Sequence, residues 1–425
     1  MGRIKTNKTG LDKKSFDIPI EKVELAFYFV KQNRGCAWID DQTIEDFEEN
    51  LEWNIYKIWN RMSSWCYFPP PVKTVEIPKG NNETRKLWIP TVWDRIAQMV
   101  VKIALEPELE EHFHKDSYGY RPNKSALQAI SQARQNCFKY DWVLDLDIKW
   151  FFDNIDHELA LKAVREHTKE KWIIMYIERW LKAPGQDNKW NISDRNKWTP
   201  QWGVISPIIA NLYLHYALDK YLEINCPTIP FERYADDGVY HCKTEKQAQW
   251  LLSVIKWRLK ECWLELNKDK TKIAYCKDSC RKEMYKNENF DFLWYTFRPR
   301  KAMSKKWKAF TWFLPAMSNK AKSHIRKEMR ELRIKSMTHK ELKDIAKLVN
   351  PKLNGWINYF WEFYRTEVYR TMEYFDIILA RWAMKKFNGR QSGFINAHKW
   401  ILKVSREQPN LFPQWKLKAR YWSIK

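Results

Sequence analysis

The chain has 425 residues and a formal net charge of +23. A chain of this length can bury a large core and is expected to form two or three domains, which excludes a small stapled scaffold. Its eight cysteines are scattered without a C-x-x-C pair, so we expect neither a disulfide framework nor a zinc ribbon, and a reducing, cytoplasmic setting. The N-terminus lacks the apolar core of a signal peptide and no run of about 18 apolar residues exists, so we expect no membrane contact.

The first predicted elements are a helix and a hairpin. Residues 41–61 have the apolar spacing of an amphipathic helix, which the Tyr-Phe-Pro-Pro-Pro segment at 67–71 ends. Residues 72–90 alternate apolar and basic positions around a Lys-Gly-Asn-Asn turn, which predicts a β-hairpin. Its basic side chains, among them Lys79 and Arg85, either contact a triphosphate or are ordinary solvated strand residues, and the sequence alone favours neither.

Helices alternate with strands in the middle of the chain. We expect helices over residues 91–114 and 125–140, a buried strand over 143–148 and another strand over 264–273. Three more helices are predicted from their start signals, which are Asp156 as an N-cap, Ser206 as a capping residue followed by Pro207, and Thr244 with Gln247 as a capping box. This order predicts a mixed α+β domain with its acidic residues gathered on one sheet.

Two acidic segments are the candidates for catalytic chemistry. The stretch FERYADDGVYHC predicts two strands joined by a tight turn that carries Asp236 and Asp237, and the upstream strand VLDLDI contains Asp145 and Asp147. An Asp-Asp pair alone is more often a solvated turn, but a further carboxylate on a buried strand favours a site for two Mg²⁺ ions. We predict Asp147, Asp236 and Asp237 as metal ligands. Asp145 and Asp153 are interpreted as structural.

The positive charge is concentrated in the C-terminal third of the chain. Residues 298–425 hold 30 of the 75 Lys and Arg residues but only 9 of the 52 Asp and Glu residues. Such a segment attracts a polyanion because binding releases condensed counterions, which predicts RNA or DNA as a partner. The interleaved aromatic residues either stack on bases or pack a core, and helical spacing favours the core for each one taken singly.

Eight segments carry a resemblance to a known family, in that family's order. They are RKLWIPTVWDRIAQ, SYGYRPNKSA, DLDIKWFFDNIDH, TPQWGVISPIIANLYLHYALD, FERYADD, LNKDKTKI, FLWYTFRPR and LNGWINYF. The chain resembles the reverse transcriptases and maturases encoded by bacterial group II introns over essentially its whole length. The resemblance implies an α+β fold of the right-hand polymerase type, with fingers and palm followed by an α-helical thumb or maturase domain.

The resemblance also implies a domain order. N-terminal helices and the fingers hairpin are expected over residues 1–95, the fingers and palm of the reverse transcriptase domain over 96–300, and the thumb or maturase domain over 301–387. Residues 388–425 are expected to form a short basic tail, either a stub that contacts target DNA or a plain terminal helix. No nuclease domain with paired cysteines is expected. The boundary near residue 300 coincides with the step in charge, which does not depend on the family.

Site residues follow from the resemblance position by position. Asp147, Asp236 and Asp237 match the metal-binding triad, with Mg²⁺ as the working ion. Lys270 matches a lysine proposed to protonate the pyrophosphate leaving group. The residues expected at the incoming nucleotide are Gln201 beside the template, Phe152 or its neighbour Phe151 as the aromatic that favours dNTPs over NTPs, and Arg85 and Lys79 at the triphosphate.

These features predict an RNA-directed DNA polymerase of a group II intron, which also binds the intron RNA to assist splicing and retrohoming. Its partners would be the group II intron RNA, a DNA target or primer, and dNTPs. The oligomeric state stays open, with a dimer as one alternative. The alternative functions are an RNA-binding maturase with impaired polymerase activity and a host-domesticated reverse transcriptase.

The chain departs from the family pattern in its tryptophans, of which it has 25 against only 11 glycines. Eleven of them stand where the family has or readily takes glycine, namely Trp38, Trp65, Trp88, Trp150, Trp198, Trp202, Trp263, Trp294, Trp307, Trp312 and Trp361. We hypothesise that these are UGA codons that the source organism decodes as glycine; the rival explanation is a decayed element with a crippled polymerase. The family accepts tryptophan at Trp59, Trp142, Trp172, Trp180 and Trp356. A second departure is Gly238, where the family usually has a bulky apolar residue.

Overall fold

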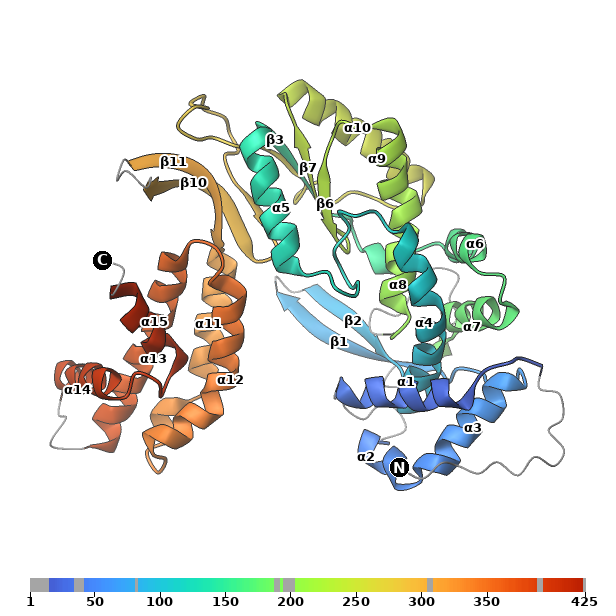
Figure 1. Cartoon of the computed structure of the whole chain (residues 1–425), viewed down its shortest axis with the longest axis horizontal. Coiled ribbons are helices and arrows are strands. Elements are labelled where there is room, and N and C mark those ends of the chain that lie inside the picture. The colour runs from blue at the N-terminus through green and yellow to red at the C-terminus, as the bar shows by residue number, and fades with distance from the viewer. Residues whose placement is uncertain are drawn as a thin grey trace.

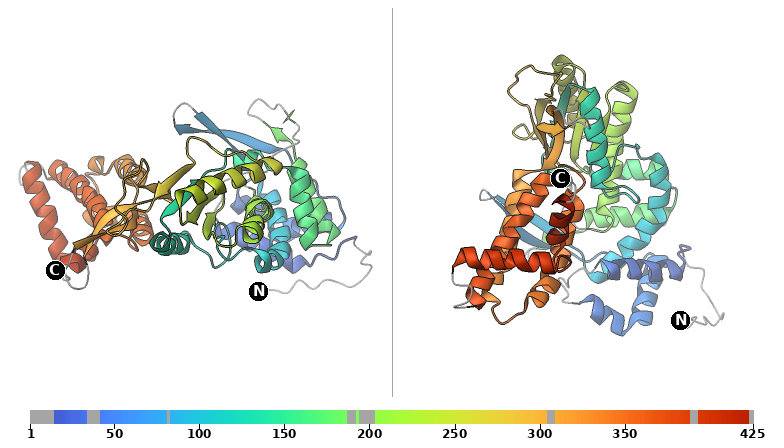
Figure 2. Two further views of the ribbon diagram at one scale, coloured as in Figure 1. Left: turned by 90° about the horizontal axis from the view of Figure 1, so that it is seen from above. Right: turned by 60° about the vertical axis from the view of Figure 1, so that its left-hand side comes forward.

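The molecule is elongated, with the C-terminal helices gathered at one end of its long axis and the N-terminal helices toward the other (Figure 1). The view from above shows the same separation, with sheets between the two groups of helices (Figure 2, left). This computed structural model describes residues 15–33, 42–80, 83–186, 192–193, 203–303, 309–387 and 393–422.

Helices make up most of the described chain. The α-helices are α1 (Ile20–Gln32), α2 (Ile44–Glu49), α3 (Leu51–Ser63), α4 (Val92–His112), α5 (Ala126–Lys139), α6 (His157–His167), α7 (Lys171–Lys182), α8 (Ser206–Leu214), α9 (Lys220–Asn225), α10 (Glu245–Glu261), α11 (Asn319–Glu331), α12 (Leu342–Phe360), α13 (Arg365–Lys386), α14 (Phe394–Glu407) and α15 (Pro413–Trp422). Two short 3₁₀ helices, η1 (Phe151–Asp153) and η3 (Ile334–Ser336), and one π-helical segment, η2 (His215–Asp219), complete them.

The strands form three sheets. They are β1 (Val72–Gly80), β2 (Glu83–Ile89), β3 (Trp142–Leu146), β4 (Gly185–Gln186), β5 (Ile192–Ser193), β6 (Phe231–Tyr234), β7 (Asp237–Cys242), β8 (Lys272–Tyr275), β9 (Phe290–Phe292), β10 (Tyr295–Met303) and β11 (Ala309–Met317). The orders within the sheets are β2-β1-β4-β5, β6-β7-β3-β8 and β11-β10-β9.

The sheet β6-β7-β3-β8 carries the acidic segments and is antiparallel throughout. Successive strand residues point to opposite faces, and β3 divides accordingly between two hydrophobic cores. Leu144 and Leu146 pack in one core together with residues of α10, whereas Val143 packs in the other together with residues of α5. Helices therefore cover both faces of this sheet.

The predicted β-hairpin at residues 72–90 is confirmed by the antiparallel pairing of β1 with β2. The short strand β4 extends this sheet by pairing in parallel with β1, and β5 pairs in turn with β4. The hairpin projects from the N-terminal helices toward the middle of the molecule (Figure 1).

The C-terminal helices share a hydrophobic core with the sheet β11-β10-β9. Trp382 and Trp415 are each 1% exposed and belong to the same cluster of buried residues as Phe297 and Phe313 in β10 and β11. Helical spacing in this basic segment therefore marks a packed core for Trp382, as expected for its aromatic residues taken singly. This core joins the basic C-terminal part to the sheets.

Several predicted boundaries were wrong. The helix expected over residues 41–61 is two helices, α2 and α3, because the backbone at Asn50 leaves the helical region with φ −123° and ψ 44°. Ser206 is the first residue of α8 and does not cap it; the N-cap is Ile205, whose side chain makes no capping bond. The strand expected over residues 264–273 begins only at Lys272. The start signal at Asp156 was right, since its side chain accepts a capping hydrogen bond at α6. Thr244 caps α10 as predicted, but the capping box is incomplete, because the side chain of Gln247 accepts from the N–H of Lys243 instead.

Tryptophan occupies a glycine-type position at two helix ends. Trp65, directly after the C-cap of α3, has φ 64°, and Trp263, directly after the C-cap of α10, has φ 56°. A left-handed residue at this position belongs to the Schellman motif, in which glycine is usual because it has no Cβ to clash. The bonds of that motif run from the N–H of Cys66 to the carbonyl of Arg61 (2.9 Å) and from the N–H of Leu264 to the carbonyl of Leu259 (2.8 Å).

A third such position lies in the turn between β9 and β10. Leu293 and Trp294 form a two-residue loop with φ 49° and 69°, and the flanking Phe292 and Tyr295 are paired. Positive φ at both positions is the geometry of a type I′ turn, which favours Asn-Gly. Trp294 thus stands where this turn favours glycine.

Tryptophans at positions where the family accepts Trp differ from Trp65, Trp263 and Trp294 in burial and in backbone conformation. Trp142, Trp172 and Trp180 are only 3–6% exposed, and none is among the described residues with positive φ. Trp65, Trp263 and Trp294, by contrast, are 45–62% exposed. Four positions assigned to glycine, Trp65, Trp150, Trp263 and Trp294, thus have a left-handed backbone, which supports the glycine hypothesis there without testing the codons. Trp361, with φ −72°, and Trp312, in β11, belong to the same set and lack this feature.

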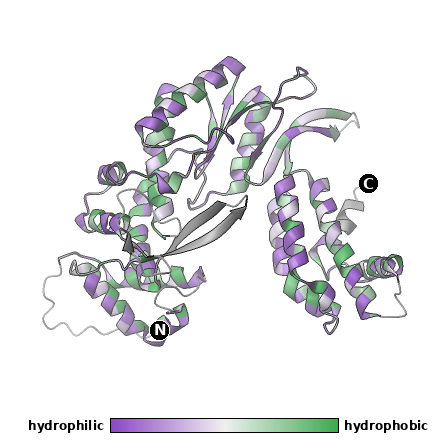
Figure 3. Ribbon diagram, turned by 180° about the vertical axis from the view of Figure 1, so that it is seen from behind, coloured by the Kyte–Doolittle hydropathy of each residue, from purple (hydrophilic) through white to green (hydrophobic). Residues whose placement is uncertain are grey.

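No helix among the described residues is long and apolar enough to span a membrane. The long helices carry hydrophilic and hydrophobic bands side by side (Figure 3), as expected for helices that pack one face on a core.

Candidate active site

The turn between β6 and β7 presents two carboxylates at the end of the sheet. Tyr234 pairs with Asp237 across the hairpin, so Ala235 and Asp236 form the two-residue loop. Ala235 has φ 56°, a conformation that a non-glycine residue adopts only where its surroundings hold it there. The loop places Asp236 at the tip and Asp237 on the first residue of β7.

Asp147 reaches the same end of the sheet from the neighbouring strand. The last pair between β3 and β7 joins Leu146 to Gly238, so one further step in this register sets Asp147 opposite Asp237. The backbone of Asp147 is held by the N–H of Asn267, which donates to its carbonyl at 2.9 Å. The three predicted acids therefore converge on one strand end.

Lys270 lies directly on this cluster. Its Nζ donates to Oδ1 and Oδ2 of Asp147 at 3.2 and 3.3 Å. The predicted proton donor and a predicted metal ligand are therefore in contact, and the ammonium supplies positive charge that a metal ion would otherwise supply to this carboxylate.

Burial, reinforced by neighbouring carboxylates, raises the pKa of two acids in this region. Loss of hydration raises the pKa of Asp237 to about 7, and the negative charges of Asp236 and Asp147 add to this effect although Lys270 opposes it. Burial likewise raises the pKa of Asp145 to about 8 against the opposing charge of Lys272, with Asp237 and Asp147 among the groups that reinforce the rise. Asp145 lies in β3, two residues before Asp147, so its side chain points to the same face of the sheet and adds a further acid there.

The carboxylates of Asp147, Asp236 and Asp237 are suitable ligands for a divalent cation, although they are not already arranged as a metal site. Carboxylate oxygens are the ligands that Mg²⁺ prefers, and the raised pKa of Asp237 indicates negative charge that a cation would relieve. Nowhere in the described ranges, however, do three His, Cys, Asp or Glu side chains form a ready group for a metal ion. Asp147, Asp236 and Asp237 would therefore have to draw closer when they bind one.

The residues expected at the nucleotide are described only in part. Phe151 and Phe152 lie in η1 just after Asp147; both are buried, at 2% and 7% exposure, and their ring centroids are 5.2 Å apart. Lys79 and Arg85 lie on β1 and β2, but their side chains fall outside the described part of the chain, and Gln201 lies outside it altogether. Their roles stay predictions.

Trp150 stands between Asp147 and the two phenylalanines with φ 47° and ψ 49°. Its side chain is 61% exposed, and the Nζ of Lys149 lies 5.5 Å from its ring centroid. A left-handed residue is again a position that favours glycine. Trp150 also lies only three residues after Asp147 in the chain.

The structure offers an account of Gly238. A Cβ built on this residue would lie 2.8 Å from the hydroxyl oxygen of Tyr240, which is 1% exposed. The two residues share a face of β7, so the ring of Tyr240 fills the space that a bulky residue at 238 would need. Gly238 and Tyr240 therefore form a compensated pair.

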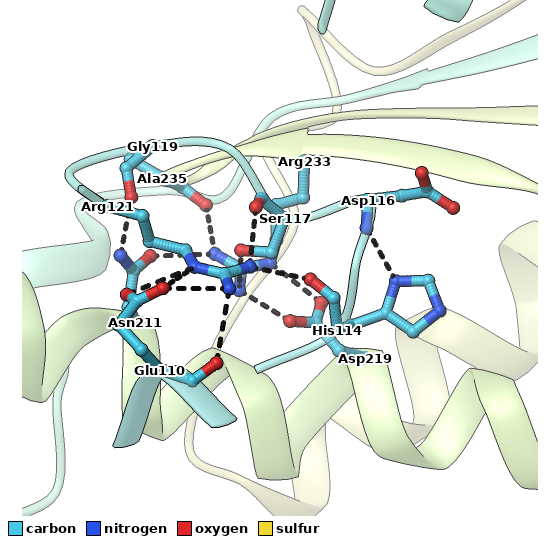
Figure 4. A network of polar contacts seen from close by, with 10 residues as sticks. All are labelled: Glu110, His114, Asp116, Ser117, Gly119, Arg121, Asn211, Asp219, Arg233 and Ala235. Carbon is cyan, nitrogen blue, oxygen red and sulfur yellow. Dashed lines mark hydrogen bonds and ion pairs between the residues drawn. The ribbon is translucent and has the colours of Figure 1, made fainter. Parts of the chain in front are cut away.

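A buried polar network behind the turn was not predicted from the sequence (Figure 4). Its centre is Arg233, whose guanidinium forms an ion pair with Asp219 and also bonds Asn211 and Ser117. An arginine in a predicted strand of the acidic hairpin was the available signal, because arginines are almost never buried unless paired. Its partners could not be named, since they lie on segments distant in sequence.

Family comparisons agree with this geometry. The family described as reverse transcriptase (RNA-dependent DNA polymerase) matches residues 77–297, which contain all the acids discussed above. The family described as the group II intron, maturase-specific domain matches residues 322–400.

Curated relatives point the same way. Group II intron-encoded protein LtrA of Lactococcus lactis is 34% identical over 201 residues, which cover 47% of this chain and 33% of the relative. Protein YkfC of Escherichia coli is 31% identical over 259 residues, covering 52% of this chain and 67% of the relative. A putative COX1/OXI3 intron 2 protein of Saccharomyces cerevisiae is 27% identical over 221 residues, covering 52% of this chain and 23% of the relative. The chain thus spans about a third of the length of the Lactococcus relative.

On the match of its central half and of its C-terminal part, the chain belongs to the reverse transcriptase family, in the branch that carries the group II intron maturase domain.

Proposed function

We propose that the chain is an RNA-directed DNA polymerase of a group II intron that also binds the intron RNA and assists its splicing and retrohoming. The observation that carries the proposal is the convergence of Asp147, Asp236 and Asp237 at one end of a sheet, with Lys270 in contact with Asp147. The match to the maturase domain and the names of the intron-encoded relatives support an RNA partner.

In this mechanism Asp147, Asp236 and Asp237 would hold Mg²⁺. When bound, two such ions supply a clamp for the attacking and leaving oxygens of phosphoryl transfer. Burial is the main cause of the raised pKa of Asp237, and the negative charges of Asp236 and Asp147 add to it, as expected where acids converge. Lys270, a cation with a transferable proton beside Asp147, would protonate the pyrophosphate as it leaves.

The remaining contacts to the dNTP are proposed from the family pattern. Lys79 and Arg85, on the projecting hairpin, would bind the triphosphate, and Gln201 would lie beside the incoming nucleotide and template. Phe152, or Phe151, would crowd the 2′ position of the sugar. The more complete burial of Phe151 favours Phe152 for this role.

We assign residues 1–95 to N-terminal helices and the fingers hairpin, 96–300 to fingers and palm, 301–387 to a thumb that binds intron RNA, and 388–425 to a basic tail. The excess of positive charge after residue 298 supports RNA binding by the C-terminal part. The seven cysteines in the described part are free thiols, which supports a reducing, cytoplasmic setting.

The second candidate is an RNA-binding maturase whose polymerase is impaired. Trp150 favours it if the residue is genuine, because a bulky side chain then occupies a left-handed position three residues after Asp147. Primer extension on an RNA template with Mg²⁺ and dNTPs tests both candidates. Three proteins are compared: the chain with its tryptophans, a version with glycine at the eleven positions, and that version with Asp236→Asn.

The polymerase proposal expects extension by the glycine version and none by its Asp236→Asn derivative. If none of the three proteins extends a primer but all three bind group II intron RNA and promote its splicing, the maturase candidate replaces the polymerase proposal. Failure of every version in both assays would refute both functions.

A further inference from the structure

Arg233 is the most completely bonded buried charge near the candidate active site. It lies in β6, two residues before Ala235, and is 1% exposed. All five of its N–H groups have acceptors. Nε donates to Oδ1 of Asp219 (2.7 Å), Nη1 to Oδ1 of Asn211 (3.1 Å) and the carbonyl of Ala235 (2.9 Å), and Nη2 to Oδ2 of Asp219 (2.5 Å) and Oγ of Ser117 (2.8 Å).

One of these bonds acts on the catalytic turn itself. Ala235 has φ 56°, so its left-handed backbone needs an outside constraint to persist. The bond from Arg233 to its carbonyl supplies one on one side of the turn. On the other side the backbone of Gly119 approaches so closely that a Cβ there would lie 2.3 Å from the nitrogen of Ala235. The residue before Asp236 is therefore held by two contacts.

The guanidinium is itself anchored to rigid neighbours. Asp219 ends the π-helical segment η2 and is fully buried, and Asn211 lies in α8 at 2% exposure. Asn211 also donates from Nδ2 to the carbonyl of Gly119 at 2.6 Å, and Ser117 belongs to the same loop as Gly119. One network thus joins helix α8, the loop around Gly119 and the acidic turn (Figure 4).

We propose that Arg233 is a positioning residue, which fixes the carbonyl of Ala235 and through it the direction in which Asp236 and Asp237 face Asp147. The proposal rests on the proposed function, since it assigns these acids to a metal site. Arg233 does not touch substrate or metal; it acts through the turn.

Arg121 provides a matched control within the same network. Its side chain is 6% exposed, and it forms an ion pair with Glu110 and donates to the carbonyls of His114 and Ser117. None of these bonds reaches the acidic turn. Arg121 and Arg233 therefore have the same chemistry, a similar burial and a shared loop, but only Arg233 contacts the residue before Asp236.

The test compares Arg233→Lys with Arg121→Lys. Lysine keeps the charge opposite the buried carboxylate, which favours folding, but its single ammonium cannot reproduce the forked set of bonds that includes the carbonyl of Ala235. Both variants are first checked for native circular dichroism. Three properties are then measured: hydrogen exchange of the amides at 234–238, binding of Mn²⁺ followed by loss of its free electron-spin-resonance signal, and primer extension at saturating dNTP.

We expect Arg233→Lys to exchange these amides faster, to bind Mn²⁺ more weakly and to lose on the order of 10²-fold in kcat, the usual effect of a small misplacement of catalytic groups. Arg121→Lys should resemble the unsubstituted chain in all three properties.

Equal behaviour of the two variants would overturn the positioning role. Faster exchange in Arg233→Lys with unchanged Mn²⁺ binding would overturn it as well, because the turn would then loosen without affecting the acids. A failure of the proposed function looks different. The unsubstituted chain and its Asp236→Asn variant would then bind Mn²⁺ equally or not at all, and the inference about Arg233 would fail together with the proposed function.

Discussion

Replacing Trp263 by glycine should stabilise the protein, whereas the same replacement at Trp257 should destabilise it. Both indoles are largely exposed, at 62% and 57%. Trp257 lies inside α10, and Trp263 follows its C-cap with φ 56°. The two variants lose the same side chain from similarly exposed sites, so the difference between them reports the backbone conformation.

The magnitude follows from two opposing effects. A left-handed conformation costs an L-residue roughly 1–2 kcal/mol, which glycine avoids. Glycine also makes the unfolded chain more flexible, which costs about 0.5–1 kcal/mol. Trp263→Gly should therefore raise the free energy of unfolding by about 1 kcal/mol, while Trp257→Gly should lower it by about 0.5 kcal/mol because glycine is the poorer helix former.

Urea unfolding followed by far-ultraviolet circular dichroism measures both changes. Tryptophan fluorescence is unsuitable because each substitution removes a fluorophore. If Trp263→Gly destabilises the protein as much as Trp257→Gly, the position does not favour glycine and the reasoning fails. The gene provides a separate test, since UGA is expected at Trp65, Trp150, Trp263 and Trp294, and UGG codons there would refute the codon hypothesis.

Three further predictions concern single sites. Lys270→Gln removes the ammonium 3.2 Å from Asp147; Mn²⁺ should then bind more tightly while single-turnover extension slows, and weaker binding together with a slower rate would contradict the assigned role. Burial raises the pKa of Asp94 from its ordinary 3.8 to about 6. The protonated Asp94 therefore contributes its full share to the free energy of unfolding below pH 3.8, and this contribution is lost as the pH rises through about 6. The difference in unfolding free energy between the wild-type chain and Asp94→Asn should change by about 3 kcal/mol across that window, and a difference independent of pH would show that the shift is absent. Gly238→Val should be strongly destabilising because its Cβ would lie 2.8 Å from the Tyr240 hydroxyl, and Tyr240→Ala should relieve part of that loss in a double-mutant cycle, so purely additive effects would rule out the compensated pair.

Local patterns were enough to predict the acidic hairpin and most helices. The hairpin follows from two β-rich runs around a short polar turn, and its strands β6 and β7 lie where the sequence indicates. The wrong boundary at Asn50 coincides with a local side-chain bond. The side chain of Asn54 donates to the carbonyl of Phe47 across the break at 2.9 Å, and periodicity contains no information about such a bond.

The sequence is enough to propose the acids of the site but not the residues that hold their turn. Asp147, Asp236 and Asp237 can be found because carboxylates on buried strands are unusual. The support of the turn depends on Arg233 meeting Ser117 and Asn211, which belong to other segments of the chain. Only the folded chain brings these residues together. The left-handed backbone at Ala235 is likewise a product of that packing.

The uneven charge and the elongated shape together affect how the protein approaches a nucleic acid. Because the positive excess begins near residue 298 and the helices that follow lie at one end of the long axis (Figure 2), the molecule has a large electric dipole moment. In the field of a polyanion such a molecule rotates as it approaches, before any specific contact forms. Its C-terminal end would then arrive first, and the acidic strand ends, which the same field repels, would meet nucleic acid only after that end has docked.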